Sequence, residues 1–351
     1  MENLVREMFK KKIYDKRILI FGHSGFVGSW LSLSLSTFGA KILGVSLKMQ
    51  NKNYLSNNKE FIKKIKTLNC DLNNLDIIQN KIINFKPEII IHLASQPMVK
   101  MGFIDPVNTY RTNISGTIKV LEIVRKIPTV KKILIFTSDK VYSNSEKKTL
   151  NENSKLGGLD PYSASKSAQD IITQSYGFSF FKKKKLIILR SGNIIGGGDW
   201  ANNRLIPDIV RSYLNNGILK VRSINSTRPW VHIFDVLNAI MVILTKTFSN
   251  NQTIIYNLSP SVKKQITVKK IIDLILKKTQ IKKIKIKKIK SNIKEKKYLH
   301  ISSNKALKEL GWSTKLDLKK ALIQSIKFYL LSKNKIYNEA IEQIKLYFSI
   351  K

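Results

Sequence analysis

The sequence predicts an α/β protein built on a doubly wound parallel sheet, with a smaller mixed α/β domain at its C-terminal end. Two observations support this prediction. Short apolar runs alternate with longer helical patterns from Lys16 to about Leu189, and a glycine-rich turn follows the first of these runs. Strands that alternate with helices are joined by right-handed crossovers, which give a parallel sheet with helices on both faces.

Each strand is predicted from a short apolar run bounded by turn-forming or polar residues. These runs are RILIFG (17–22), KILGVSL (41–47), TLNCDL (67–72), PEIIIHLAS (87–95), KKILIFTS (131–138) and KLIILRSG (185–192). A later run, IIYNLSP (254–260), has the same character and is predicted to be another core strand. Ligands of such sheets bind at the carboxyl ends of the strands, so we expect the site in the loops that follow them.

The composition is that of a soluble globular protein. The chain has 351 residues, of which 43% are hydrophobic, which is enough for a large core. Its single cysteine, Cys70, excludes an intramolecular disulfide, and the charged start MENLVREMFKKK lacks the apolar segment of a signal peptide. No apolar run approaches the ~20 residues of a membrane-spanning helix. We therefore expect a cytoplasmic protein that has no membrane partner.

The net charge of +40 raises the question of a nucleic-acid partner. The excess lysine is spread along the chain together with abundant isoleucine and asparagine, which indicates a compositional bias and not a binding patch. The most basic stretch, VKKIIDLILKKTQIKKIKIKKIKSNIKEKK (268–297), is interpreted as a helix followed by an exposed strand with solvated lysines. A polyanion-binding surface is the alternative for this stretch, and no nucleic-acid partner is predicted.

The first loop, GHSGFVG, has the pattern of a dinucleotide-binding turn. Gly22 suits the tight turn after the strand, Gly25 allows the backbone to approach a diphosphate, and Gly28 lets the following helix pack on the sheet. The helix N-terminus then holds the phosphates. The predicted contacts in this loop also include His23, Phe26 and Val27.

The cofactor is predicted to be NAD, although the residues after the second strand do not decide between NAD and NADP. The segment GVSLK has no acidic side chain for a ribose 2′-hydroxyl, and Lys48 would suit a 2′-phosphate. Asp71, after the third strand, is suited to accept a hydrogen bond from the adenine amino group.

We expect residues 1–190 to form this Rossmann-type NAD-binding domain, with about 230–260 returning to it. Residues 191–351 are expected to form an interleaved substrate-binding domain.

Catalytic residues are predicted in ILIFTSDK and DPYSASK. Tyr162 and Lys166 lie four residues apart and therefore on one face of a helix. A lysine ammonium beside a phenol lowers the phenol's pKa, so Tyr162 can take a proton from a substrate hydroxyl as its hydride leaves. Ser138, at the end of a strand, can hydrogen-bond the same hydroxyl.

With these motifs, the chain resembles the extended short-chain dehydrogenase/reductase superfamily from about Lys16 to Trp312. Within it, the chain is similar to the CDP-glucose 4,6-dehydratases, segment by segment and in order. The segments are GHSGFVGSWLSLSL, IHLASQPMVK, TSDKVY, DPYSASK, SGNIIGGGDWANNRLIPDIVRS, STRPWVH and KYLHISSNKALKELGW.

The resemblance implies a lyase reaction in three steps. Hydride leaves hexose C4 for NAD+, water is eliminated across C5 and C6, and the same hydride returns to C6. Asp139 is then the acid that protonates the departing C6 hydroxyl, and Lys140 is the base for the C5 proton. A lysine acts as a base only when neutral, which requires a buried environment. The alternative is that Asp139 caps the next turn and Lys140 pairs with a phosphate.

The resemblance also implies the remaining contacts and the assembly. Further NAD contacts are expected at Leu72, Leu93, Ala94 and Asn113, and substrate contacts at Gln96, Asn193, Arg204 and Arg228. The implied substrate is a nucleotide-diphosphate hexose, CDP-glucose, bound by a homodimer that serves deoxysugar and polysaccharide biosynthesis. No metal centre is predicted, because the four histidines are scattered. The alternatives are another nucleotide-sugar dehydratase or 4-epimerase, and, more remotely, a noncatalytic nucleotide- or RNA-binding protein.

Overall fold

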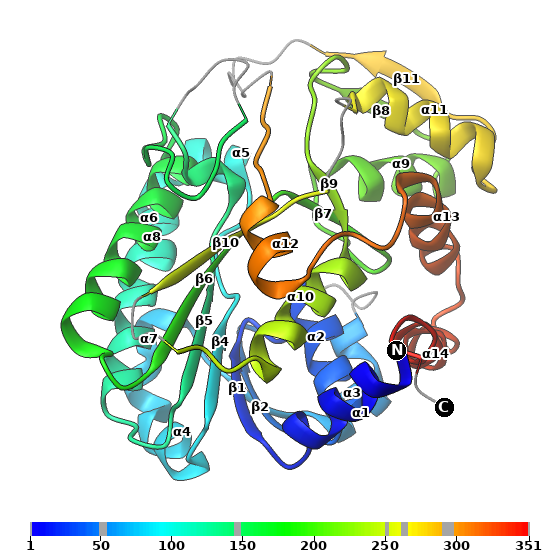
Figure 1. Ribbon diagram of the computed structural model, residues 1–351. Coiled ribbons are helices and arrows are strands. Elements are labelled where there is room, and N and C mark those ends of the chain that lie inside the picture. The colour runs from blue at the N-terminus through cyan, green and yellow to red at the C-terminus, as the bar shows by residue number, and fades with distance from the viewer. Residues whose placement is uncertain are drawn as a thin grey trace.

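The computed structural model describes residues 2–48, 55–143, 149–249, 253–260, 266–289 and 298–349. Its centre is a parallel sheet of 7 strands in the order β10-β6-β5-β4-β1-β2-β3, which confirms the predicted doubly wound fold (Figure 1). The strands are β1 (Arg17–Phe21), β2 (Lys41–Ser46), β3 (Lys66–Asn69), β4 (Ile89–His92), β5 (Lys132–Phe136), β6 (Lys185–Ser191) and β10 (Ile254–Leu258).

Both faces of the sheet are apolar because alternate residues of each strand point to opposite sides. Ile18 and Ile20 of β1 belong to one core cluster, while Leu19 and Phe21 belong to the other. The helices over the Leu19 face are α4 (Gln79–Phe85), α5 (Val99–Ile104), α6 (Pro106–Tyr110), α7 (Gly116–Arg125) and α8 (Pro161–Phe180). Two short helical segments, η2 (Leu72–Ile78) and η3 (Arg111–Ser115), lie on the same side.

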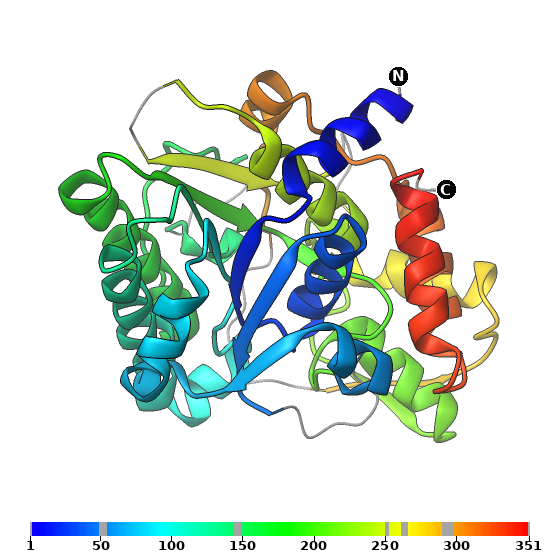
Figure 2. The ribbon, with the colours of Figure 1, turned by 90° about the horizontal axis from the view of Figure 1, so that it is seen from below.

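The helices that cover the Ile18 face come from both halves of the chain. They are α1 (Glu2–Ile13), α2 (Phe26–Thr37), α3 (Lys59–Lys64), α10 (Ile233–Thr245), α12 (Asn304–Leu310) and α14 (Ile336–Tyr347). The α1 helix packs on α10, and α14 packs on α2, so the two ends of the chain lie near each other (Figure 2).

The C-terminal half adds a smaller lobe with its own core. Its strands form two parallel pairs, β7 (Asn193–Ile195) with β9 (Trp230–His232) and β8 (Ile218–Val221) with β11 (Lys285–Lys288). Its helices are α9 (Leu205–Leu214), α11 (Val268–Lys278) and α13 (Leu318–Tyr329). Figure 1 shows this lobe above the carboxyl ends of the sheet strands.

The basic stretch 268–297 follows the prediction as far as it is described. It forms α11 and then β11, in which all four residues are exposed to solvent. Residues 290–297 lie outside the described part of the chain. Within the described ranges, no helix is long and apolar enough to cross a membrane.

Candidate active site

The turn between β1 and α2 is closed so tightly that two of its residues must be glycine. Gly22 has a φ of +83°, and a Cβ there would lie 2.6 Å from the backbone nitrogen of Ala94. A Cβ on Gly28 would lie 2.0 Å from the carbonyl oxygen of Gly22. Gly25 is the N-cap of α2 and offers no side chain to the first amide groups of that helix. The loop is therefore a cradle of backbone groups at a helix N-terminus, which suits a diphosphate.

His23 points from this loop toward β2 and β3. Its ring nitrogens lie 3.1 Å from Oγ of Ser46 and 3.0 Å from Oγ1 of Thr67, and its ring fills the space that a side chain at Gly44 would need. Burial lowers the pKa of His23 to about 4, so the ring is neutral at physiological pH. The end of β2 thus presents the hydroxyl of Ser46 in place of an acidic side chain, and Oγ of Ser24, from the glycine loop, lies 2.7 Å from it.

The other predicted cofactor residues near the sheet edge make contacts within the protein. Asp71 follows β3, and its Oδ1 accepts hydrogen bonds from the backbone and side-chain nitrogens of Asn73. Leu72 is buried against the position of Gly116. Phe26 is buried in the core below the glycine loop.

A cavity of about 1660 Å³ opens at the carboxyl ends of the strands, between the sheet and the C-terminal lobe. It brings together most of the residues that were predicted to be catalytic or to bind substrate. The predicted residues that line it are Val27, Leu93, Ser138, Asp139, Lys140, Tyr162, Lys166, Asn193, Arg204 and Arg228.

Ser138, Asp139 and Lys140 form a single turn after β5. Oγ of Ser138 donates a hydrogen bond of 3.0 Å to Oδ1 of Asp139 and accepts one from the backbone N–H of Lys140. Asp139 is 2% exposed, whereas Lys140 is half-buried at the cavity wall. The turn therefore presents a hydroxyl, an acid and an amine to the same space.

Tyr162 and Lys166 lie in the first turns of α8, which Asp160 caps by accepting a hydrogen bond from the backbone of Ser163. Burial raises the pKa of Tyr162 to about 12, while contact with the Ser138 hydroxyl and the charge of Arg204 lower it. Lys166 is not among the groups that lower this pKa, so the predicted lowering by Lys166 is not seen; its Nζ donates a 2.9 Å hydrogen bond to Oε1 of Gln169.

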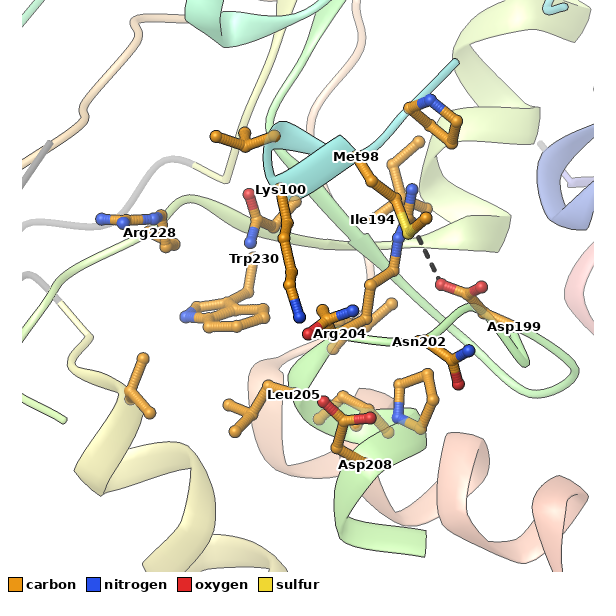
Figure 3. A pocket seen from close by; sticks show the side chains of 18 of the residues that line it. Met98, Lys100, Ile194, Asp199, Asn202, Arg204, Leu205, Asp208, Arg228 and Trp230 are labelled. Atoms are coloured by element: carbon orange, nitrogen blue, oxygen red, sulfur yellow. Dashed lines mark hydrogen bonds and ion pairs between the residues drawn. The ribbon is translucent and has the colours of Figure 1, made fainter. Parts of the chain in front are cut away.

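Arg204 is held at the cavity by an ion pair. Its Nη1 lies 3.0 Å from Oδ2 of Asp199, and Oδ1 of Asp199 caps the following turn at Ala201 (Figure 3). The glycine run before Asp199 packs closely, since a Cβ on Gly197 would lie 2.3 Å from atoms of the Phe328 side chain. The GGGDW segment therefore fixes the loop from which Arg204 enters the cavity.

Gln96 and Asn113 lie beside this cavity and bond to each other. The backbone N–H of Gln96 donates a 2.7 Å hydrogen bond to Oδ1 of Asn113. Nδ2 of Asn113 in turn donates a 2.9 Å hydrogen bond to Oγ of Ser165. The side-chain nitrogen of Gln96 donates to Oγ1 of Thr109. Asn113 sits in a π-helical turn, a rare feature that is frequent at functional sites. It joins the loop after β4 to α8, whereas the Gln96 side-chain amide is engaged by Thr109 of α6 and by the backbone N–H of Met98.

The structure adds residues that the sequence interpretation missed. Lys100 of α5 reaches into the cavity toward Arg204 and Trp230 (Figure 3). Asp170 of α8 forms a buried ion pair with Arg190 of β6, with both side chains at most 1% exposed. An arginine within the apolar run KLIILRSG is the sequence signal for this pair, because a buried charge requires a partner. Lys100 has no comparable signal in so basic a chain.

Comparison with known proteins agrees with this geometry. A family model described as GDP-mannose 4,6 dehydratase matches residues 19–325. The chain belongs to this family of NAD-dependent nucleotide-sugar epimerases and dehydratases. CDP-glucose 4,6-dehydratase of Salmonella typhimurium is 33% identical to this family member over 90% of each chain. The dTDP-D-glucose 4,6-dehydratase of Dictyostelium discoideum is 29% identical over 71% of this chain and 59% of its own.

Solved structures of epimerases and dehydratases share the fold of this family member. An epimerase from Methanothermobacter thermautotrophicus aligns with a TM-score of 0.81 and 19% identity, covering 98% of each chain. A dTDP-glucose 4,6-dehydratase from Bacillus anthracis in complex with NAD aligns with a TM-score of 0.75 and 23% identity, covering 94% of this chain and 98% of its own. NAD binding is typical of the family.

Proposed function

We propose that this family member is a cytoplasmic CDP-glucose 4,6-dehydratase, which converts CDP-D-glucose to CDP-4-keto-6-deoxy-D-glucose for deoxysugar and polysaccharide biosynthesis. The observation that carries the proposal is the buried carboxyl of Asp139, bonded to Ser138 in the same cavity as Tyr162. A dehydratase needs an acid to expel a hydroxyl, whereas a simple 4-epimerase does not. The similarity to the Salmonella enzyme over 90% of both chains supports CDP-glucose as the substrate.

NAD fits the loop between β1 and α2. The backbone cradle at Gly22, Gly25 and Gly28 would hold the diphosphate, because glycine at positions 22 and 28 lets the turn close against Ala94 and onto the start of α2, where backbone groups face a bound anion. The NAD-binding part then comprises residues 1–190 with about 230–260, and residues 191–351 form the substrate-binding part. Bound NAD supplies the acceptor for the C4 hydride and the donor that returns it to C6.

The side chains of the cavity divide the proton transfers among them. Tyr162 removes the proton of the C4 hydroxyl, and Ser138 hydrogen-bonds the same oxygen. Asp139 donates a proton to the departing C6 hydroxyl, while Lys140 removes the proton from C5. Lys166 completes the proposed catalytic set as a basic group in the same cavity, with its Nζ bonded to Gln169.

Substrate binding is assigned to the basic side of the cavity. Arg204 and Arg228 present guanidinium groups suited to diphosphate oxygens, and Asn193, at the start of β7, lines the same cavity. Gln96 is assigned to the sugar end through the loop after β4. Lys100 joins this group, because its side chain extends into the same cavity (Figure 3).

The homodimer is part of the proposal. Large apolar side chains are exposed on the neighbouring helices α5, α6 and α8, where Ile104 is 62%, Val107 74%, Ile171 54% and Phe178 86% exposed. Ile171 and Phe178 are seven residues apart and therefore share a face of α8. A second copy that docks on these helices would bury the apolar face of each partner.

The test is incubation of the purified protein, without added cofactor, with CDP-, dTDP-, UDP- and GDP-hexoses. Mass spectrometry measures the loss of one water from each. Water lost from CDP-glucose alone supports the full proposal, and water lost from another nucleotide hexose changes the substrate. An unchanged mass with an altered sugar by NMR would instead identify a 4-epimerase. No turnover with NAD added, together with salt-sensitive RNA binding, would support a noncatalytic nucleotide-binding protein.

A further inference from the structure

A buried chain of hydrogen bonds begins at the ammonium group of Lys166 and leads to the end of β4. Nζ of Lys166 donates a 2.9 Å hydrogen bond to Oε1 of Gln169, and Nε2 of Gln169 donates one of 2.9 Å to Oγ1 of Thr117. Nε2 of His92 lies 3.0 Å from the same Thr117 oxygen. Gln169, Thr117 and His92 are fully buried, so these groups bond to one another and not to solvent.

The position of each proton in this chain follows from the single hydrogen of Thr117. The Thr117 hydroxyl donates it to the carbonyl oxygen of Asn113 over 2.8 Å, so Oγ1 accepts from its other two neighbours. Nε2 of His92 therefore carries a hydrogen. Burial and the charge of Lys166 lower the pKa of His92 to about 3, which keeps the ring neutral.

The same count of donors and acceptors fixes the orientation of the Gln169 side-chain amide. Its NH2 group must face Thr117, which has no hydrogen left to donate in that direction. Its oxygen therefore faces Lys166. The reversed amide would place NH2 against the ammonium and oxygen against oxygen, which would lose both hydrogen bonds.

We propose that Gln169 is a positioning residue that holds the ammonium group of Lys166 for hydride transfer, and that Thr117 and His92 fix the orientation of its amide. The inference rests on the proposed function, in which Lys166 acts beside Tyr162. A neutral amide oxygen accepts the hydrogen bond and leaves the net charge of the ammonium uncompensated. A carboxylate at this position would cancel that charge.

The nearby acid Asp170 does not hold the Lys166 ammonium in place of Gln169. Burial lowers the pKa of Lys166 to about 7, and the charge of Asp170 opposes that shift. Asp170 itself is engaged by two hydrogen bonds from Arg190. Tyr162, Asp139 and Lys140 line the same cavity as Lys166, and His92 lies at the other end of the hydrogen-bond chain.

The first test measures the ionisation of Lys166 without requiring turnover. Acetic anhydride reacts with neutral amines, so labelling of Lys166 against pH, read by peptide mass spectrometry with and without NAD, gives its titration midpoint. Gln169→Glu puts a carboxylate beside the ammonium and should raise the midpoint by at least about one pH unit. Gln169→Met removes the acceptor and should lower it. Gln343→Met, at a buried glutamine of α14, should leave it unchanged.

The second test measures C4 oxidation with a CDP-hexose that lacks the C6 hydroxyl and therefore cannot eliminate water. Gln169→Met should slow reduction of bound NAD about tenfold at neutral pH, and Gln169→Glu should move the pH profile to higher pH. If Gln169→Met does not fold, the pH profile of the isosteric Gln169→Glu variant tests the positioning role.

Unchanged labelling midpoints in folded Gln169 variants would overturn the positioning role, whatever the substrate. Shifted midpoints in a protein that oxidises no nucleotide sugar would instead refute the proposed function and leave the role of Gln169 toward Lys166 standing.

Discussion

The carboxylate of Asp170 and the guanidinium of Arg190 form a two-point ion pair, with nitrogen–oxygen distances of 2.7 and 2.8 Å. The pair joins α8, which carries Tyr162 and Lys166, to β6 of the sheet. Oγ1 of Thr137, at the end of β5, also donates to Asp170. The helix with the candidate catalytic residues is thus tied to two strands at the floor of the cavity.

Asp170→Asn should destabilise the protein by about 3–5 kcal/mol, because it leaves the Arg190 charge buried without a carboxylate. Chemical denaturation followed by circular dichroism measures the change. Asp76→Asn, which breaks an exposed pair with Lys119, should leave the denaturation midpoint in place. Equal midpoints for the Asp170 variant and the wild type would contradict the assigned role of the pair.

Stability should fall as the pH drops from 7 to 5. Burial lowers the pKa of His232 to about 3, so the unfolded chain takes up a proton below about 6.5 while the folded protein does not. One such histidine costs roughly 2 kcal/mol over this range. Nδ1 of His232 caps α10, a role that asparagine also fills. His232→Asn should therefore lose less stability between pH 7 and pH 5 than the wild type, in thermal melts at both pH values. A variant that loses as much as the wild type would exclude His232 as the cause.

Asp139→Asn should separate oxidation from elimination. The amide cannot protonate the C6 hydroxyl, so water loss should slow about 10²–10⁴-fold while reduced NAD accumulates. Lys140→Met should give the same pattern if it removes the base for C5. Stopped-flow absorbance follows the reduced cofactor, and mass spectrometry follows water. Asp273→Asn on α11 is the matched control. Normal water loss in either cavity variant would reject that residue's role.

Gly197→Ala should disturb the loop that carries Asp199 and Arg204, because the added methyl would collide with Phe328. We expect a lower melting temperature and a raised KM for the nucleotide sugar. Gly217→Ala is the control, since a Cβ there would lie 3.8 Å from its nearest neighbour. Similar KM values for the two variants would show that the glycine run does not position Arg204.

Phe178→Glu combined with Ile171→Glu should convert the proposed dimer to a monomer, because two charges would enter its apolar interface. Sedimentation velocity measures the species present. Leu346→Glu, at an 80% exposed position of α14, should leave the dimer intact. A wild-type protein that sediments as a monomer would remove the dimer from the proposal.

The sheet could be predicted from the sequence because each strand is a local apolar run, and the glycine turn is specified by residues that are adjacent in the chain. The loop after β5 and the start of α8 carry local motifs too, so Ser138 and Tyr162 could be placed together. The hydrogen-bond chain from Lys166 through Gln169 and Thr117 could not be predicted in this way, because it depends on contacts between residues up to 52 positions apart. A buried glutamine has no periodic signature, and its role is defined only by the atoms around it.

The place of β10 beside β6 has a consequence for biosynthesis. Residues Ile254 to Leu258 pair with Ile187 to Ser191, yet much of the C-terminal lobe is synthesised between them. On the ribosome, β6 must therefore persist as an open edge until its last neighbour has emerged. Unpaired edges of this kind template the addition of foreign strands. A protein truncated before residue 254 should consequently aggregate. We expect chaperones to bind nascent chains of that length.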